Sequence, residues 1–140
     1  MTFENLPNNW PDLPLDDPDL RADVVDLVVS YRDRLAGCLA LLALDEVHLI
    51  MGEPIVIAEM GERGPADVHE VLTALFEHGR PPGLVAALGR PGPPRFTDGD
   101  RELHQALVEV CRAQEVELIA TYVASESAVR ELPDHLRLAS

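Results

Sequence analysis

The chain has 140 residues, of which 46% are hydrophobic and 4% are aromatic, and its formal net charge is −14. This length predicts one domain that buries its own core, packed by aliphatic rather than aromatic side chains. The large excess of carboxylates argues against independent binding to nucleic acid or to anionic lipid, because both are negatively charged. Neutral or cationic partners are favoured instead.

Residues 1–17 contain three prolines, which remove backbone donors and restrict the residues before them. We therefore expect an extended N-terminal arm that precedes the folded domain. Its apolar side chains Trp10, Leu13 and Leu15 leave two hypotheses open. They pack back onto their own domain, or they anchor a second copy of the chain in a dimer.

The folded domain is expected to begin with a helix over residues 18–35. Asp17 is a suitable N-cap and Pro18 suits the first helical position. Apolar residues then recur at helical spacing up to Leu35, and Gly37 ends the pattern.

A set of apolar runs follows the first helix. The continuous run "CLALLAL" predicts a strand covered on both faces. After a turn at Asp45 and Glu46, "VHLIM" predicts a second strand. Gly52 separates it from "PIVIAEM", which is either a third strand or the second strand resumed after a bulge.

The second half of the chain alternates helices and strands. A helix is expected from Pro65 to a stop at Gly79, followed by a short buried strand over residues 83–88. Thr97 caps the next helix, with Asp100 completing a capping box. The stretch "VELIATYVA" (116–124) predicts the last long strand, and residues 125–140 predict a short edge strand or turn and then loose, partly helical chain.

This order predicts a single three-layer α/β/α domain over residues 18–132, in which a mixed sheet lies between helices, with a C-terminal tail at 133–140. Cys38 and Cys111 lie in apolar runs and show no C-x-x-C spacing, so we expect two buried free thiols. No secretory leader or apolar run of membrane-spanning length is visible, and the expected location is the cytoplasm.

The stretch "GCLALLALDEVHLIMGEPIVIAEMG" and the later loop "ALGRPGPPRFTDGD" resemble the JAMM/MPN metalloprotease-like family, and most closely its RadC-type bacterial branch. That family carries a zinc loop of the form H-x-H-P-x-x-…-S-x-x-D. The resemblance covers roughly residues 36–132 and implies the deaminase-like topology of the family. Pro91, Thr97 and Asp100 match the motif, the last two if one residue is deleted, whereas Leu88 and Arg90 stand in place of the histidines.

This departure predicts that the chain has no metal, no cofactor and no catalytic residue at the loop. A zinc site needs about three ligands. Leu88 has no donor atom, Arg90 carries a fixed positive charge and Asp100 alone cannot hold the ion. No G-x-S-x-G elbow points to nucleophilic catalysis either.

The histidines show no metal-binding spacing such as H-x-H or H-E-x-x-H. His69 and His104 are expected at the rims of their helices, and His78 at a helix C-terminus. His48 and His135 are the other two histidines.

Three arginines, Arg80, Arg90 and Arg95, flank the strand 83–88 and its loop. One hypothesis makes them surface charges paired with nearby carboxylates. The other makes them a contact site for a small anion or an acidic peptide near a helix N-terminus.

The leading functional hypothesis is a non-catalytic scaffold or regulatory protein-interaction module that self-associates. The resemblance supports it, because MPN-type domains that lack the metal motif act as partners in assemblies and often pair with another such domain. Two alternatives are a binding domain for a small anionic ligand at the loop 89–98, and an enzyme whose site the sequence does not reveal.

Overall fold

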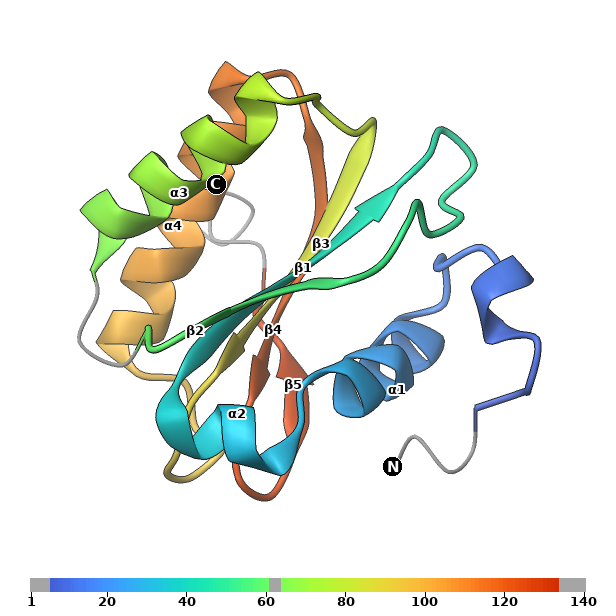
Figure 1. Ribbon diagram of the computed structural model, residues 1–140. Helices are drawn as coiled ribbons and strands as arrows, with labels where there is room; N and C mark the ends of the chain where they lie inside the picture. The colour runs from blue at the N-terminus through green and yellow to red at the C-terminus, as the bar shows by residue number, and fades with distance from the viewer. Residues whose placement is uncertain (1–5, 61–63, 134–140) are drawn as a thin grey trace.

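A mixed β-sheet forms the centre of the computed structural model, which describes residues 6–60 and 64–133 (Figure 1). In this part of the chain the strand order is β2-β1-β3-β4-β5. Only β3 and β4 run parallel, and the other neighbours are antiparallel. The strands are β1 (Cys38–Leu44), β2 (Ile55–Ala58), β3 (Gly83–Gly89), β4 (Glu117–Ala124) and β5 (Val129–Glu131).

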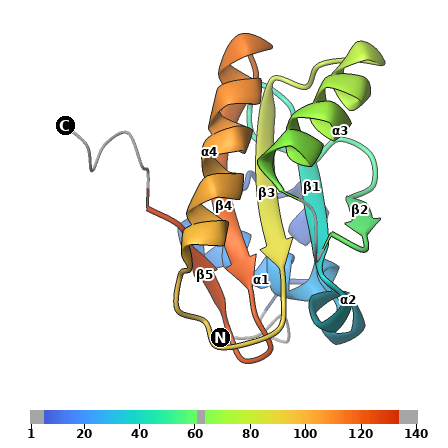
Figure 2. The same ribbon diagram turned by 90° about the vertical axis from the view of Figure 1, so that its left-hand side faces the viewer.

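Helices cover both faces of this sheet (Figures 1 and 2). On one face lie α3 (Pro65–Glu77) and α4 (Asp98–Ala113), and on the other lies α1 (Pro18–Val28), which is followed by the short α2 (Tyr31–Ala36). Each face has its own apolar cluster, because side chains alternate across a strand. The α/β class and the mixed sheet predicted from the sequence are thereby confirmed.

The prediction of one helix over residues 18–35 is wrong, because the chain breaks between α1 and α2. Val29 is extended (φ −93°, ψ 97°), and the Ser30 side chain accepts a hydrogen bond from the Asp33 amide at 3.1 Å. The Arg34 side chain also donates to the Val29 carbonyl at 3.0 Å. A serine that caps a new helix competes with helix continuation, and this competition overrode the apolar spacing.

The prediction of "VHLIM" as a strand is also wrong. Only Ile50 bridges Leu44 there, because the Asp45 side chain accepts hydrogen bonds from the amides of Val47 and Leu49 and closes a turn. The pairing with β1 then resumes at β2. Because no strand forms at "VHLIM", the segment "PIVIAEM" supplies the second strand, β2, and pairs directly with β1.

The other elements lie within a residue or two of their predicted bounds. The capping box is confirmed: the Asp100 amide donates to Thr97 Oγ1 at 3.1 Å, and the Thr97 amide donates to Asp100 Oδ2 at 2.9 Å. The edge strand predicted in the tail is β5. The partly helical chain predicted from residue 134 onward falls outside the described residues.

The N-terminal arm is only partly extended, since Trp10–Asp12 form a turn of 3-10 helix. In this single chain Leu15 is 1% exposed and joins the apolar cluster under α1, with Trp10 packed partly against it. Leu13 is half-buried. The arm thus packs against its own domain here, which is the first of the two hypotheses for its apolar side chains.

Candidate functional site

A cleft of about 430 Å³ opens at the carboxyl end of β3. Figure 2 shows this end of β3 between the start of α4 and the short α2. The first residues of β1 and α3 complete the walls. Ligands of α/β proteins commonly bind in such crevices at strand carboxyl ends, so this cleft is the candidate site.

All five positions matched to the degenerate zinc motif line this cleft, namely Leu88, Arg90, Pro91, Thr97 and Asp100. The fold therefore brings together residues that the sequence spreads over a strand, a loop and a helix start. Leu88 is 4% exposed, and it lies within the sheet between β1 and β4.

The central contact of the site is a two-pronged ion pair between Arg90 and Asp100. Arg90 Nε donates to Asp100 Oδ1 and Arg90 Nη2 donates to Asp100 Oδ2, each at 2.8 Å. The Asp100 side chain is only 3% exposed and that of Arg90 is 19% exposed. Such a pair aligns the flat guanidinium with both carboxylate oxygens and fixes the loop to the start of α4.

The remaining donors of Arg90 bind the loop backbone. Nη1 donates to the carbonyls of Pro91 at 3.2 Å and Pro93 at 2.9 Å, and Nη2 donates to the Arg95 carbonyl at 2.8 Å. A guanidinium has five N–H groups, and these contacts together with the ion pair engage all of them. An external anion at Arg90 would have to displace internal acceptors.

The surroundings of Asp100 stabilise the ionised form of its carboxyl group. Burial by itself would raise the pKa of this carboxyl, but the hydrogen bonds from Arg90 and from the Thr97 backbone, together with the charge of Arg90, lower the pKa below its usual value. The carboxylate therefore stays ionised at neutral pH, as the partner of a cation that belongs to the same chain.

The donor set does not fit the zinc ion of the JAMM/MPN family. Leu88 offers no ligand atom, the Arg90 charge would repel a dication, and both Asp100 oxygens already accept hydrogen bonds. Within residues 6–60 and 64–133, no group of three His, Cys, Asp or Glu side chains is placed to hold a metal ion. The described residues instead form the Arg90–Asp100 ion pair at this position.

Cys38 lies in the wall of the cleft but is poorly suited to nucleophilic attack. It is 2% exposed, and burial raises the pKa of its thiol to about 11. Cys111 lies on the buried face of α4, where burial raises the pKa of its thiol to about 12. Both thiols are free and buried, as the sequence predicted.

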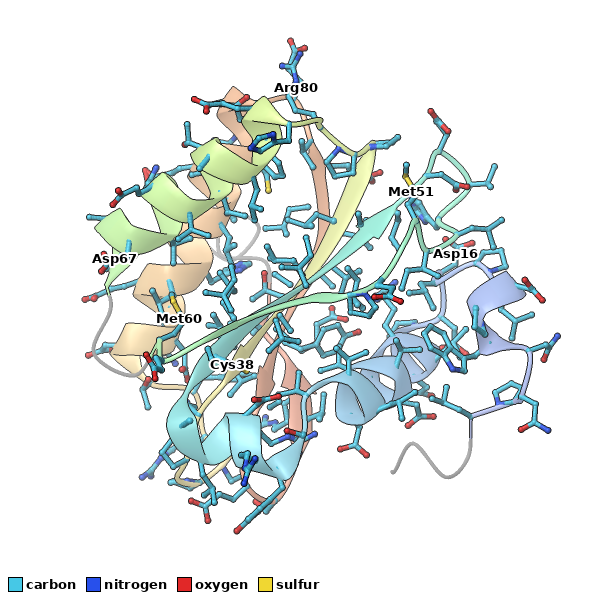
Figure 3. All side chains as sticks on the ribbon, viewed as in Figure 1. Asp16, Cys38, Met51, Met60, Asp67 and Arg80 are labelled. Carbon is cyan, nitrogen blue, oxygen red and sulfur yellow. The ribbon has the colours of Figure 1, made fainter. Side chains whose placement is uncertain are left out.

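The three arginines flanking β3 do not form one site. Arg80 precedes β3 at the end opposite the cleft, and Figure 3 shows it far from Cys38 in the cleft wall. Its Nη1 donates to the Gln114 carbonyl at 3.4 Å. Arg95 lies on the exposed part of the loop, and its carbonyl accepts from Arg90.

The expected histidine positions are met in part. His104 is 6% exposed, so its prediction as a rim residue is wrong. It lies on the buried face of α4, one turn after Asp100 and one before Leu107.

His69 is exposed, with Nε2 3.7 Å from Glu109 Oε1, and His78 forms the C-terminal cap of α3 as predicted. His135 lies outside the described residues.

A charged cluster that the sequence did not reveal joins the arm to the sheet. His48 Nδ1 contacts an Asp16 oxygen, and His48 Nε2 lies 3.5 Å from Glu117 Oε1 at the start of β4. The hydrogen bond with Asp16 raises the imidazole pKa above its ordinary value, and Glu117 adds to this effect. Because the carboxylates face opposite ring nitrogens, they cannot converge on one metal ion.

A second unforeseen cluster lies under α1. Arg21 Nε donates to Tyr122 Oη at 3.1 Å, and Tyr122 Oη donates to Glu131 Oε1 at 2.9 Å. Arg21 also binds the carbonyls of Leu15 and Asp16. Burial raises the pKa of Tyr122. This network holds the arm against β4 and β5, and no local spacing in the sequence signals it.

Comparison with models of known protein families gave no match, and comparison with curated proteins gave none either. In the part of the chain that the structure describes, no helix has the length and apolar character needed to cross a bilayer.

Proposed function

We propose that this chain is a non-catalytic scaffold or regulatory protein-interaction module that self-associates, built on a JAMM/MPN-like fold whose metal centre has been replaced by an ion pair. One observation carries the proposal. Arg90 donates to both oxygens of Asp100 and to three loop carbonyls, so an internal cation stands where the family motif would place its ligands.

The chemistry at this end of β3 supports a non-catalytic role. Activation of water by zinc requires a metal with an open coordination position, and Leu88 and Arg90 provide no ligand for one. The Cys38 thiol, with a pKa of about 11, stays protonated at neutral pH. The groups at hand hold the loop and the helix start in place rather than move protons.

Exposed apolar side chains support a role in protein interaction. Large hydrophobic residues with more than a third of their surface exposed are found on α1, α2 and the β1–β2 hairpin: Leu27, Tyr31, Leu35, Val47, Met51, Ile55 and Val56. We also propose a cytoplasmic location, because two free thiols persist most readily in a reducing compartment.

Light scattering across a concentration series of the full chain tests self-association. We expect the mass of a dimer at micromolar concentration, and a monomer at every concentration would contradict this part of the proposal. Trp10→Ala, compared with the full chain, tells whether the arm contributes to the contact.

Metal analysis of the purified protein tests the non-catalytic part of the proposal. We expect no stoichiometric metal. Zinc near one equivalent that is lost in Asp100→Ala, or peptidase turnover abolished by a chelator, would overturn it.

A further inference from the structure

The candidate cleft has apolar walls. Its hydrophobic lining side chains come from α2, β1, β3, α4 and the segment after β2, and they are Leu35, Leu39, Met60, Leu88 and Leu103. Leu35 is 48% exposed, and Tyr31, one turn earlier on the same face of α2, is 59% exposed. The apolar surface of the cleft therefore continues outward over α2.

Among the described residues, the arginine that lines the cleft and the starts of the two neighbouring helices already have internal hydrogen-bond partners. All N–H groups of Arg90 bind internal acceptors. The start of α3 is capped by Asp67, which accepts from the Gly64 amide at 3.0 Å, and the start of α4 is capped by Thr97 and Asp100. The positive ends of both helices are thus met by carboxylates of this chain, which leaves the cleft poorly suited to an anion.

One exposed carboxylate lines the mouth of the cleft. It belongs to Glu102, whose side chain forms no hydrogen bond or ion pair with the described residues. Arg32 and Arg95, exposed on the adjoining α2 and loop, do not line the cleft. In a chain with net charge −14, a carboxylate that has no ion-pair partner among the described residues and lies beside an apolar cavity favours a ligand that is apolar at its tip and cationic beside it.

We infer that the cleft binds a segment of a partner protein that inserts a leucine-sized apolar side chain and carries arginine or lysine next to it. The inference rests on the proposed function as an interaction module and names its contact site. The volume of about 430 Å³ lies within the roughly 300–1,000 Å³ typical of ligand pockets, which is room for an anchoring side chain and part of its neighbours.

Three blocked pentapeptides serve as probes, with glycine at both ends and a central triplet of Arg-Leu-Arg, Arg-Ala-Arg or Glu-Leu-Glu. They are titrated into the ¹⁵N-labelled full chain, and the amide signals of four lining glycines, Gly37, Gly64, Gly89 and Gly99, report on the cleft. We expect Arg-Leu-Arg to shift these signals, Arg-Ala-Arg to bind about tenfold more weakly because the apolar anchor is lost, and Glu-Leu-Glu to leave them unchanged.

Matched variants locate the site. Leu35→Asn, which removes the apolar contact without adding charge, should abolish the shifts caused by Arg-Leu-Arg, whereas Leu27→Asn, at a similarly exposed leucine (40%) that does not line the cleft, should not. Glu102→Gln should weaken binding severalfold, whereas Glu109→Gln on the same helix should leave it unchanged. All four positions are on the surface, and the unperturbed remainder of each spectrum verifies the fold.

Equal binding of Arg-Leu-Arg and Arg-Ala-Arg would overturn the inference, because charge alone would then explain the contact. Binding that survives Leu35→Asn, or the absence of any shift, would overturn it as well. These results are separable from the proposed function. A chain that dimerises but ignores the probes contradicts only the cleft, and a chain that stays monomeric yet binds Arg-Leu-Arg contradicts only self-association.

Discussion

Two charged clusters lie at opposite ends of the parallel pair β3 and β4, and each ties an irregular segment to the sheet. At the carboxyl end, Arg90 and Asp100 join the loop to α4 with a carboxylate that is 3% exposed. At the amino end, His48 joins the arm to β4 through Asp16 and Glu117, whose side chains are 66% and 65% exposed.

The contrast teaches that burial, more than the presence of opposite charges, determines how much a charged cluster contributes to the free energy of unfolding. Exposed pairs contribute about 0–1 kcal/mol, because water and salt screen them. Removing one partner of a buried pair costs about 3–5 kcal/mol, since the other charge is left without compensation. Substitutions at the two ends should therefore differ several-fold in their effect.

The largest difference is expected between Asp100→Asn and Asp16→Asn. The first leaves the Arg90 guanidinium without its counter-charge and should lower the free energy of unfolding by about 3 kcal/mol. The second removes an exposed partner and should cost about 0.5 kcal/mol. Urea denaturation of both variants measures the two losses, and equal values would refute the role of burial.

A smaller difference is expected between two glycines at the ends of β3. A Cβ at Gly89 would lie 2.5 Å from Cys38 Sγ and 3.1 Å from Val29 Cγ1, whereas at Gly83 its close contact is Ile119 Cδ1 at 2.8 Å. The end of an isoleucine side chain can turn aside. Gly89→Ala should therefore cost about 2 kcal/mol and Gly83→Ala about 1 kcal/mol or less. Thermal unfolding compares them, and the reverse order would show that the cleft wall is not crowded.

Acid should weaken the stabilisation that the Arg90–Asp100 pair provides. The folded-state pKa of Asp100 lies below its unfolded value, so its contribution to stability is complete above about pH 4 and is lost as the pH falls through the folded-state pKa. The stability gap between the natural chain and Asp100→Asn should accordingly shrink as the pH falls below about 4. A gap that stays constant over this range would mean that Asp100 is not held in its charged form by Arg90.

The smallest effect is expected from His48. Its folded-state pKa is raised, so the stabilisation is complete below the unfolded value of about 6.5 and is lost as the pH rises through the folded-state pKa. His48→Asn suits the test, because residue 48 has a φ of 66°, which asparagine tolerates. Its cost should be about 0.5 kcal/mol at pH 6 and should vanish in alkali. An NMR titration midpoint of His48 at or below 6.5 would contradict the pairing of His48 with Asp16 and Glu117.

The sequence predicted the elements that depend on neighbouring residues. The run "CLALLAL", the strand after Gly83 and the capping box of Thr97 with Asp100 appear where they were expected. The break between α1 and α2 was missed, because the Ser30 cap and the hydrogen bond from Arg34 to the Val29 carbonyl across the break act against the helical spacing of the apolar side chains.

The candidate site divides in the same way. The sequence by itself determined which atoms the loop offers: a leucine and a guanidinium cannot coordinate zinc in any conformation. Only the tertiary structure decided that all N–H groups of Arg90 donate to Asp100 and to the loop carbonyls. It also decided that Arg80 lies at the far end of β3 and that His48 contacts Asp16 and Glu117. Side-chain chemistry is a property of each residue, whereas partners distant in the chain are set by how the strands pair.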